Sequence, residues 1–123
     1  MTAFLLVCLG AAVGAPARYL VDRAVQSRHD SVMPWGTLTV NLTGSLVLGV
    51  LAGLAVHREV PDGVLWAVGT GFCGALTTYS TLGYETLRLY ESGAWLYAVG
   101  NVTVSLAAGL GAASLGYLLG AAV

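Results

Sequence analysis

Charged residues are scarce in this sequence: six Asp and Glu and five Lys and Arg make up 9% of its 123 residues. Soluble domains carry about 25% charged residues. Hydrophobic residues instead reach 57%, which places the chain among membrane proteins with the lipid bilayer as its surroundings. We expect no nucleic-acid partner.

Four stretches contain no charged residue, and each approaches or exceeds the about 20 residues that a helix needs to cross a bilayer. The first reaches this length once it continues past Arg18. We therefore expect an all-α membrane protein with a single four-helix domain over residues 1–123. The expected spans are about 2–24, 33–56, 63–88 and 94–121.

The sequence also lacks residues that several classes of protein require. No Lys or Arg precedes Arg18, so the first segment is expected to be a retained helix rather than a cleavable signal peptide. Neither His29 nor His57 lies within an uncharged stretch, and no paired nucleophile and base are visible, so we expect no enzyme. A proton-coupled multidrug exporter needs a buried carboxylate in its first span, and residues 4–17 offer none.

The connections between the spans carry few arginines. The first and third contain Arg23, Arg28 and Arg88, whereas the second contains Arg58. Positively charged loops favour the cytoplasm. This bias is small, so the sequence leaves both orientations open.

Glycines recur four residues apart, a spacing that lets helix backbones approach closely. The pairs are Gly10 and Gly14, Gly49 and Gly53, and Gly116 and Gly120. Four short helices enclose little on their own, so we expect a homo-oligomer.

Polar side chains form two stripes at a spacing of four residues, which places each stripe on one helix face. The stripes are Thr37, Asn41 and Ser45 in the second span and Tyr97, Asn101 and Ser105 in the fourth. They predict a polar seam shared by these two helices. The alternative is that the amides and hydroxyls only join helices, at about 0.6 kcal/mol per bond.

The third span contains the stretch GFCGALTTYST at residues 71–81. Thr and Gly are poor helix formers, so a break between Gly74 and Thr78 is expected. Backbone groups left unpaired at membrane depth are costly unless protein, water or an ion satisfies them. A break here therefore predicts an ion or ligand site, and the residues alone leave the sign of the ion open.

The charged residues nearest the spans have partners of opposite sign one turn away. Arg18 precedes Asp22, and Glu85 precedes Arg88, which predicts structural pairs. No charge lies in the middle of a span, so neither a proton relay nor a charged selectivity filter is expected.

Three segments form a specific pattern: GAAVGAPARY at 10–19, GTLTVNLTGSLVLG at 36–49 and GTGFCGALTTYSTLGYE at 69–85. They resemble the small bacterial fluoride channels of the Fluc or CrcB family. The resemblance covers three of the four spans in order, and the third segment is the most specific.

This resemblance implies a passive, fluoride-selective channel that exports fluoride, a multi-pass protein of the bacterial inner membrane. It also implies a broken third helix and an antiparallel dimer of subunits in opposite orientations. The partner is a second copy or a paired homologous chain. Such dual topology agrees with the small charge bias.

The resemblance also assigns roles to single residues. The implied fluoride path passes Asn41, Tyr79, Ser80, Thr81 and Ser105. A structural sodium ion, which is not transported, is implied at the backbone carbonyls of Gly74 and Thr77. For Arg18, the opposite charge of Asp22 one turn away predicts a structural role.

One departure from the family pattern falls in the third segment. The usual stretch reads Thr-Thr-Phe-Ser-Thr-Phe, whereas this chain has Tyr79 and Leu82 at the two phenylalanine positions. Tyrosine keeps an aromatic ring edge, and leucine does not. The alternatives to a fluoride channel are a proton-coupled small transporter and a non-conducting membrane subunit.

Overall fold

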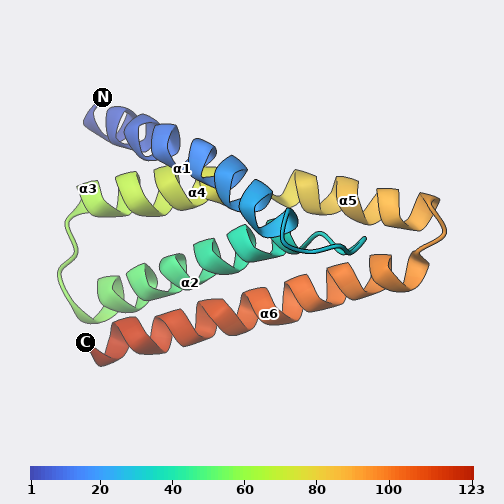
Figure 1. Cartoon of the computed structure of the whole chain (residues 1–123). Helices are drawn as coiled ribbons and strands as arrows, with labels where there is room; N and C mark the ends of the chain where they lie inside the picture. The colour runs from blue at the N-terminus through green and yellow to red at the C-terminus, as the bar shows by residue number, and fades with distance from the viewer.

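The computed structural model describes residues 1–123, and all of its regular elements are helical (Figure 1). The expected all-α fold is therefore confirmed. Three helices are long and apolar enough to cross a membrane. They are α1 (Thr2–Gln26), α2 (Trp35–His57) and α6 (Trp95–Ala122).

The remaining helical segment is divided into pieces. Its first half consists of α3 (Asp62–Val64), the π-helix η1 (Leu65–Cys73) and α4 (Gly74–Leu76). After two extended residues, α5 (Tyr79–Glu91) forms the second half. The predicted break in the third helix is present.

The break lies at Thr77 and Thr78. The backbone is extended there, with ψ 155° at Thr77 and φ −148°, ψ 125° at Thr78. Gly74, at the start of the interval expected from the sequence, remains helical with φ −63° and ψ −36°. Glycine flexibility is therefore not what interrupts the helix, and the break falls on two β-branched threonines, a residue type that favours extended backbone.

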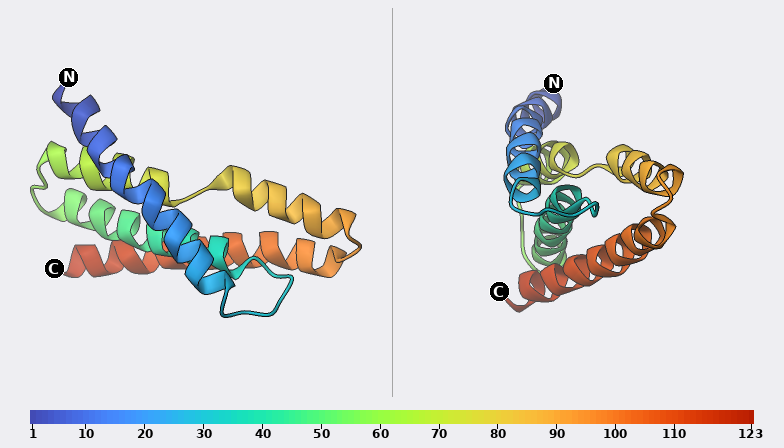
Figure 2. Two further views of the ribbon diagram at one scale, coloured as in Figure 1. Left: turned by 45° about the horizontal axis from the view of Figure 1, so that its top comes forward. Right: turned by 45° about the vertical axis from the view of Figure 1, so that its right-hand side comes forward.

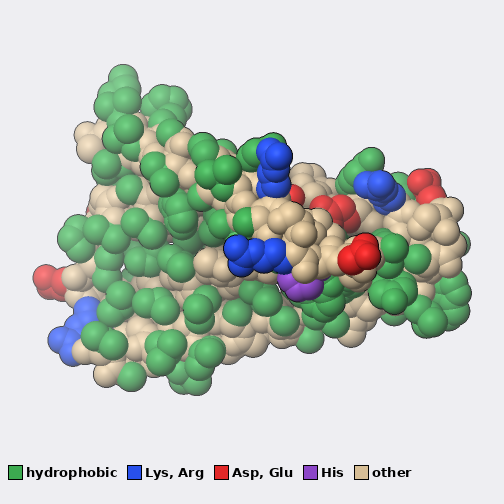
Figure 3. Space-filling view, in the orientation of Figure 1, with side chains coloured by type: hydrophobic (Ala, Val, Ile, Leu, Met, Phe, Trp, Pro, Cys, Tyr) green, Lys and Arg blue, Asp and Glu red, His purple; other side chains and the backbone are tan.

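The four segments alternate in direction, so both termini lie at the same end of the molecule (Figure 1). In Figure 1 and in the left view of Figure 2, α2 and α6 run side by side, while α5 and the first half of α6 extend beyond the other helices. On the visible face most side chains are hydrophobic, and charged groups gather near the C-terminal end of α1 and along α5 (Figure 3).

The glycine pairs mark the closest helix contacts, as expected. A Cβ at Gly49, Gly53, Gly116 or Gly120 would meet a backbone carbonyl oxygen across the α2–α6 contact. Gly10 and Gly14 of α1 make the same kind of contact with carbonyl oxygens of η1. These glycines hold α2 to α6 and α1 to the first half of the broken segment.

The interior of a single chain is small. Of the 123 residues, 19 are buried, and long apolar side chains of all four segments face outwards. Such a surface suits a chain that is surrounded by lipid.

We expect Gly116→Ala to lower the melting temperature of the protein in detergent, because the added methyl group meets the carbonyl oxygen of Leu46. Overpacking costs about 1–3 kcal/mol, against the about 1 kcal/mol that Ala gains over Gly in a helix. Gly111→Ala is the control, since its Cβ meets no atom within 4 Å. Equal melting temperatures of the two variants would contradict the tight contact.

Candidate functional site

The amide of Asn41 pairs with the backbone at the helix break. Its Nδ2 donates to the carbonyl oxygen of Thr78 at 3.0 Å, and the N–H of Thr78 donates to its Oδ1 at 2.7 Å. One side chain of α2 thus supplies both a donor and an acceptor, as a neighbouring backbone would. The pairing satisfies two groups that the break removes from the helical ladder.

Thr78 also begins α5. Its Oγ1 accepts the backbone N–H of Thr81 at 3.2 Å, which is the usual N-cap arrangement. The same hydroxyl donates to Thr81 Oγ1 at 3.0 Å and lies 3.3 Å from Ser80 Oγ. Three hydroxyls and the Asn41 amide therefore gather at the break.

Thr77 ends the first half of the broken helix. Its N–H and its Oγ1 both donate to the carbonyl oxygen of Cys73, at 3.0 and 2.9 Å. The side chain therefore has one fixed orientation, with its hydroxyl turned back onto the preceding turn.

Several carbonyl groups at the break lose their usual helical donors, and those of Gly74 and Thr77 are among them. The N–H of Thr78, which would reach Gly74 in an intact helix, donates to Asn41. The N–H of Thr81, which would reach Thr77, donates to the Thr78 hydroxyl. The carbonyls of Gly74 and Thr77 are thus left for another partner, and carbonyl oxygens suit a hard cation.

The carbonyl of Thr77 and the N–H of Thr78 belong to the same peptide group. The chain has no cis peptide, so these two groups point in opposite directions. Because the N–H points at Asn41, the carbonyl of Thr77 points away from α2. The Thr77 carbonyl, an acceptor that suits a cation, and the Thr78 N–H, a donor, therefore point to opposite edges of one peptide group.

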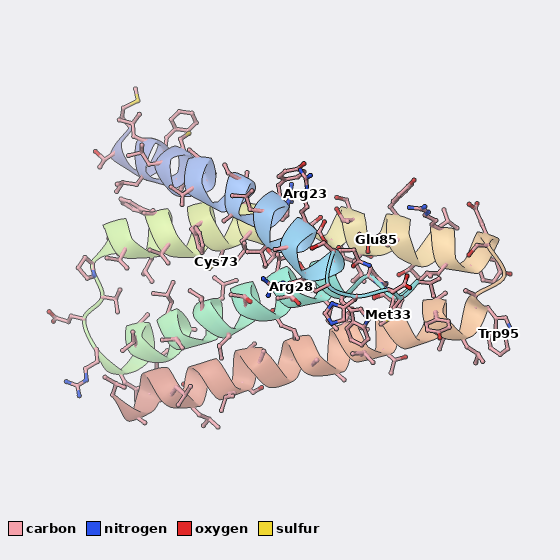
Figure 4. All side chains as sticks on the ribbon, in the orientation of Figure 1. Arg23, Arg28, Met33, Cys73, Glu85 and Trp95 are labelled. Carbon is pink, nitrogen blue, oxygen red and sulfur yellow. The ribbon has the colours of Figure 1, made fainter.

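Thr37 and Glu85 form a second polar contact between α2 and the broken segment. Thr37, which is 3% exposed, donates through Oγ1 to Glu85 Oε1 at 2.7 Å. The other carboxyl oxygen of Glu85 is buried without a partner, and Figure 4 shows this side chain turned towards the start of α2. The expected pair of Glu85 with Arg88 is therefore wrong, because the carboxyl group turns towards α2 instead.

The polar stripe of α6 faces α5. Asn101, 1% exposed, donates to Thr86 Oγ1 at 3.0 Å and accepts from Ser105 Oγ at 3.5 Å. Thr86 in turn donates to the carbonyl of Leu82 at 2.7 Å. No hydrogen bond joins the two stripes, so the seam expected between them is wrong. Thr37 and Asn41 of one stripe and Asn101 of the other bond to the broken segment instead, because the rotation of each helix turns these side chains towards it.

The residues expected along the fluoride path lie in different surroundings. Asn41 and Thr81 are half-buried at the break, and Ser80 is exposed beside them. Tyr79 is 89% exposed and lines a groove of about 680 Å³ between α5 and α6. Ser105 is half-buried on α6. The structure brings Asn41, Ser80 and Thr81 together around Thr78, whereas Tyr79 and Ser105 make no hydrogen bond to this group.

The sequence placed Thr37 in a polar stripe, Thr78 at the expected break and Glu85 in an ion pair, but it did not indicate the bonds that these residues make at the site. The i, i+4 spacing of Thr37 and Asn41 was a usable signal, but it does not show which helix they face. Arg18 is half-buried on α1, and its structural role stays a prediction.

A family model described as CrcB-like protein, Camphor Resistance (CrcB), matches residues 5–117. The chain belongs to this family. It is a multi-pass membrane protein, as expected.

The chain is similar over most of its length to proteins named fluoride-specific ion channels. FluC 1 of Frankia casuarinae is 58% identical over 98% of this chain and 97% of its own length. FluC 1 of Streptomyces avermitilis is 58% identical over 92% of this chain and 91% of its own. FluC 2 of Mycobacterium tuberculosis is 49% identical over 89% and 84%. These names describe channels, which confirms that the CrcB-like chain is no enzyme.

We expect Asn41→Leu to destabilise the protein, because it leaves the N–H and carbonyl of Thr78 unpaired at a cost of about 1–3 kcal/mol each. Thr43→Val is the matched control, since exposed Thr43 bonds only to the Thr39 carbonyl of its own helix. Melting temperatures in detergent compare the two. If Asn41→Leu melts no lower than Thr43→Val, the amide does not stabilise the break.

Proposed function

We propose that this chain is a subunit of a fluoride-selective channel through which fluoride leaves the cytoplasm passively. The observation that carries the proposal is the 58% identity, over 98% of this chain, to a fluoride-specific ion channel. The hydroxyl and amide groups gathered at the helix break supply the chemistry.

The proposed path passes Asn41, Tyr79, Ser80, Thr81 and Ser105. One N–H of the Asn41 amide pairs with Thr78, so the second is left for an anion. Ser80 and Thr81 add hydroxyl donors, and a tyrosine ring edge carries partial positive charge. Together these groups replace part of the hydration shell of a small anion. None of them carries a full positive charge, which would bind the anion too tightly for it to pass.

We propose that the channel is an antiparallel dimer with a second copy or a paired homologous chain. The groove between α5 and α6 supports this, because it is lined by 11 residues, 8 of them hydrophobic, and lies where these helices extend beyond the others. Tyr79 at its edge has no cover in a single chain. A second subunit that fills the groove would complete the path past this ring.

We further propose a structural sodium ion at the carbonyls of Gly74 and Thr77. The N–H groups that would pair with these carbonyls in an intact helix, those of Thr78 and Thr81, donate to side chains instead. Gly74 is also exposed, so an ion can reach it. Two carbonyls are too few for a hard cation, which binds about six oxygens or more. The site therefore needs the matching carbonyls of a partner subunit or water.

The function is tested by fluoride efflux from liposomes that contain the purified protein. We expect rapid efflux for the natural chain and a loss of about tenfold or more for Asn41→Asp, equivalent to about 1.4 kcal/mol. An ionised carboxylate repels an anion and has no donor for it or for Thr78. Thr43→Val serves as the control for changes in α2.

Three outcomes would overturn this proposal. Fluoride that stays inside, with the chain alone and with a paired homologue, rules out the channel. Efflux that requires a proton gradient indicates a coupled transporter. Stable dimers with no flux of any ion indicate a non-conducting subunit.

We expect sodium to stabilise the dimer. Replacing sodium by a large organic cation should lower the melting temperature, because the carbonyls of Gly74 and Thr77 then lose their partner. Thr77→Ser should keep this dependence, since the ligand atom belongs to the backbone. Identical melting temperatures in the two salts would exclude the sodium site.

A further inference from the structure

Gly44 lies directly against the side chain of Thr77. It follows Asn41 by three residues, so both residues are on the face of α2 that meets the broken segment. A Cβ at Gly44 would collide with Thr77 Cγ2. The next atoms are Thr77 Cβ at 3.6 Å and the Cys73 carbonyl oxygen at 3.8 Å, both at ordinary contact distance. A single methyl group is therefore the obstacle.

The methyl group of Thr77 cannot swing aside freely. Its Oγ1 donates to the Cys73 carbonyl at 2.9 Å, and in threonine the position of Oγ1 determines that of Cγ2. Rotating the methyl group away from Gly44 would break this bond at the end of α4. The Cys73 carbonyl thus fixes the hydroxyl group of Thr77, and the methyl group of Thr77 packs against Gly44.

We propose that Gly44 is a positioning residue for the ion pathway. Because Gly44 has no side chain, the Thr77 methyl group packs directly against the backbone of α2. This contact sets the distance between α2 and the break, and at this distance Asn41 reaches both backbone groups of Thr78. Those two bonds measure 2.7 and 3.0 Å, so a shift of the break away from α2 lengthens them directly. For conduction this inference rests on the proposed fluoride channel, whereas the contact between Gly44 and Thr77 can be tested without it.

Gly44 differs from the glycines that only bring helices together. At Gly53, an added Cβ would meet the carbonyl oxygen of Tyr117, a backbone atom that no side-chain substitution removes. At Gly44 the obstacle is a side-chain methyl group, which Thr77→Ser deletes while keeping the hydroxyl. A positioning role of Gly44 therefore predicts rescue by Thr77→Ser, and general helix packing does not.

The experiment measures the effect of Gly44→Ala in two backgrounds, the natural chain and Thr77→Ser. Each protein is assayed for fluoride efflux from liposomes and for its melting temperature in detergent. In the natural background we expect efflux to fall about tenfold or more, equivalent to about 1.4 kcal/mol, with a lower melting temperature. In the Thr77→Ser background, the losses of efflux and of melting temperature caused by Gly44→Ala should be a small fraction of those in the natural background.

Gly53→Ala, made in the same two backgrounds, is the control. Its effect should be the same with and without Thr77→Ser, because the two residues share no contact. If Gly44→Ala does not fold but the double variant does, the proposal is supported.

Equal losses from Gly44→Ala in both backgrounds, no loss in either, or failure of both to fold would overturn it. If the natural chain conducts no fluoride, the channel proposal fails. The melting temperatures then still test the contact between Gly44 and the Thr77 methyl group.

Discussion

The pairing of Asn41 with the backbone of Thr78 is the interaction on which the rest of this structure depends. An interrupted helix exposes N–H and carbonyl groups that lipid cannot satisfy. Here one amide satisfies two of them, at 2.7 and 3.0 Å, and the Thr78 hydroxyl caps the helix that follows. Without this pairing the N–H and the carbonyl of Thr78 would lose the partner that α2 gives them at the break.

The same pairing separates two kinds of ion chemistry. Because the Thr78 N–H is directed at α2, the Thr77 carbonyl is directed away from it. An anion would find the amide hydrogens of Asn41 on the α2 side of the peptide, and a cation would find the Thr77 carbonyl oxygen on the other. In the proposed channel, sodium would therefore hold the break from the side opposite to the fluoride path, so that binding of one ion need not block the other.

Hydropathy and residue type predicted a large part of this arrangement. Uncharged stretches located the apolar helices, glycine spacing located their contacts, and the Thr and Gly content of the third segment located its break to within a few residues. The contact of Thr37 with Glu85 could not be predicted, because spacing shows which residues share a face and not which helix that face meets. The π-helix η1 was also missed, since hydropathy does not distinguish it from an α-helix.

The exposed end of α5 explains why one chain is insufficient for the proposed path. Asn41 and Thr81 lie at the break, Tyr79 faces outwards with 89% of its surface exposed, and Ser105 faces Asn101 on α6. Within one subunit these groups therefore do not surround a common space. A partner in the groove between α5 and α6 would place its own surface against Tyr79 and Leu82, and the ring edge that Leu82 lacks would have to come from that partner.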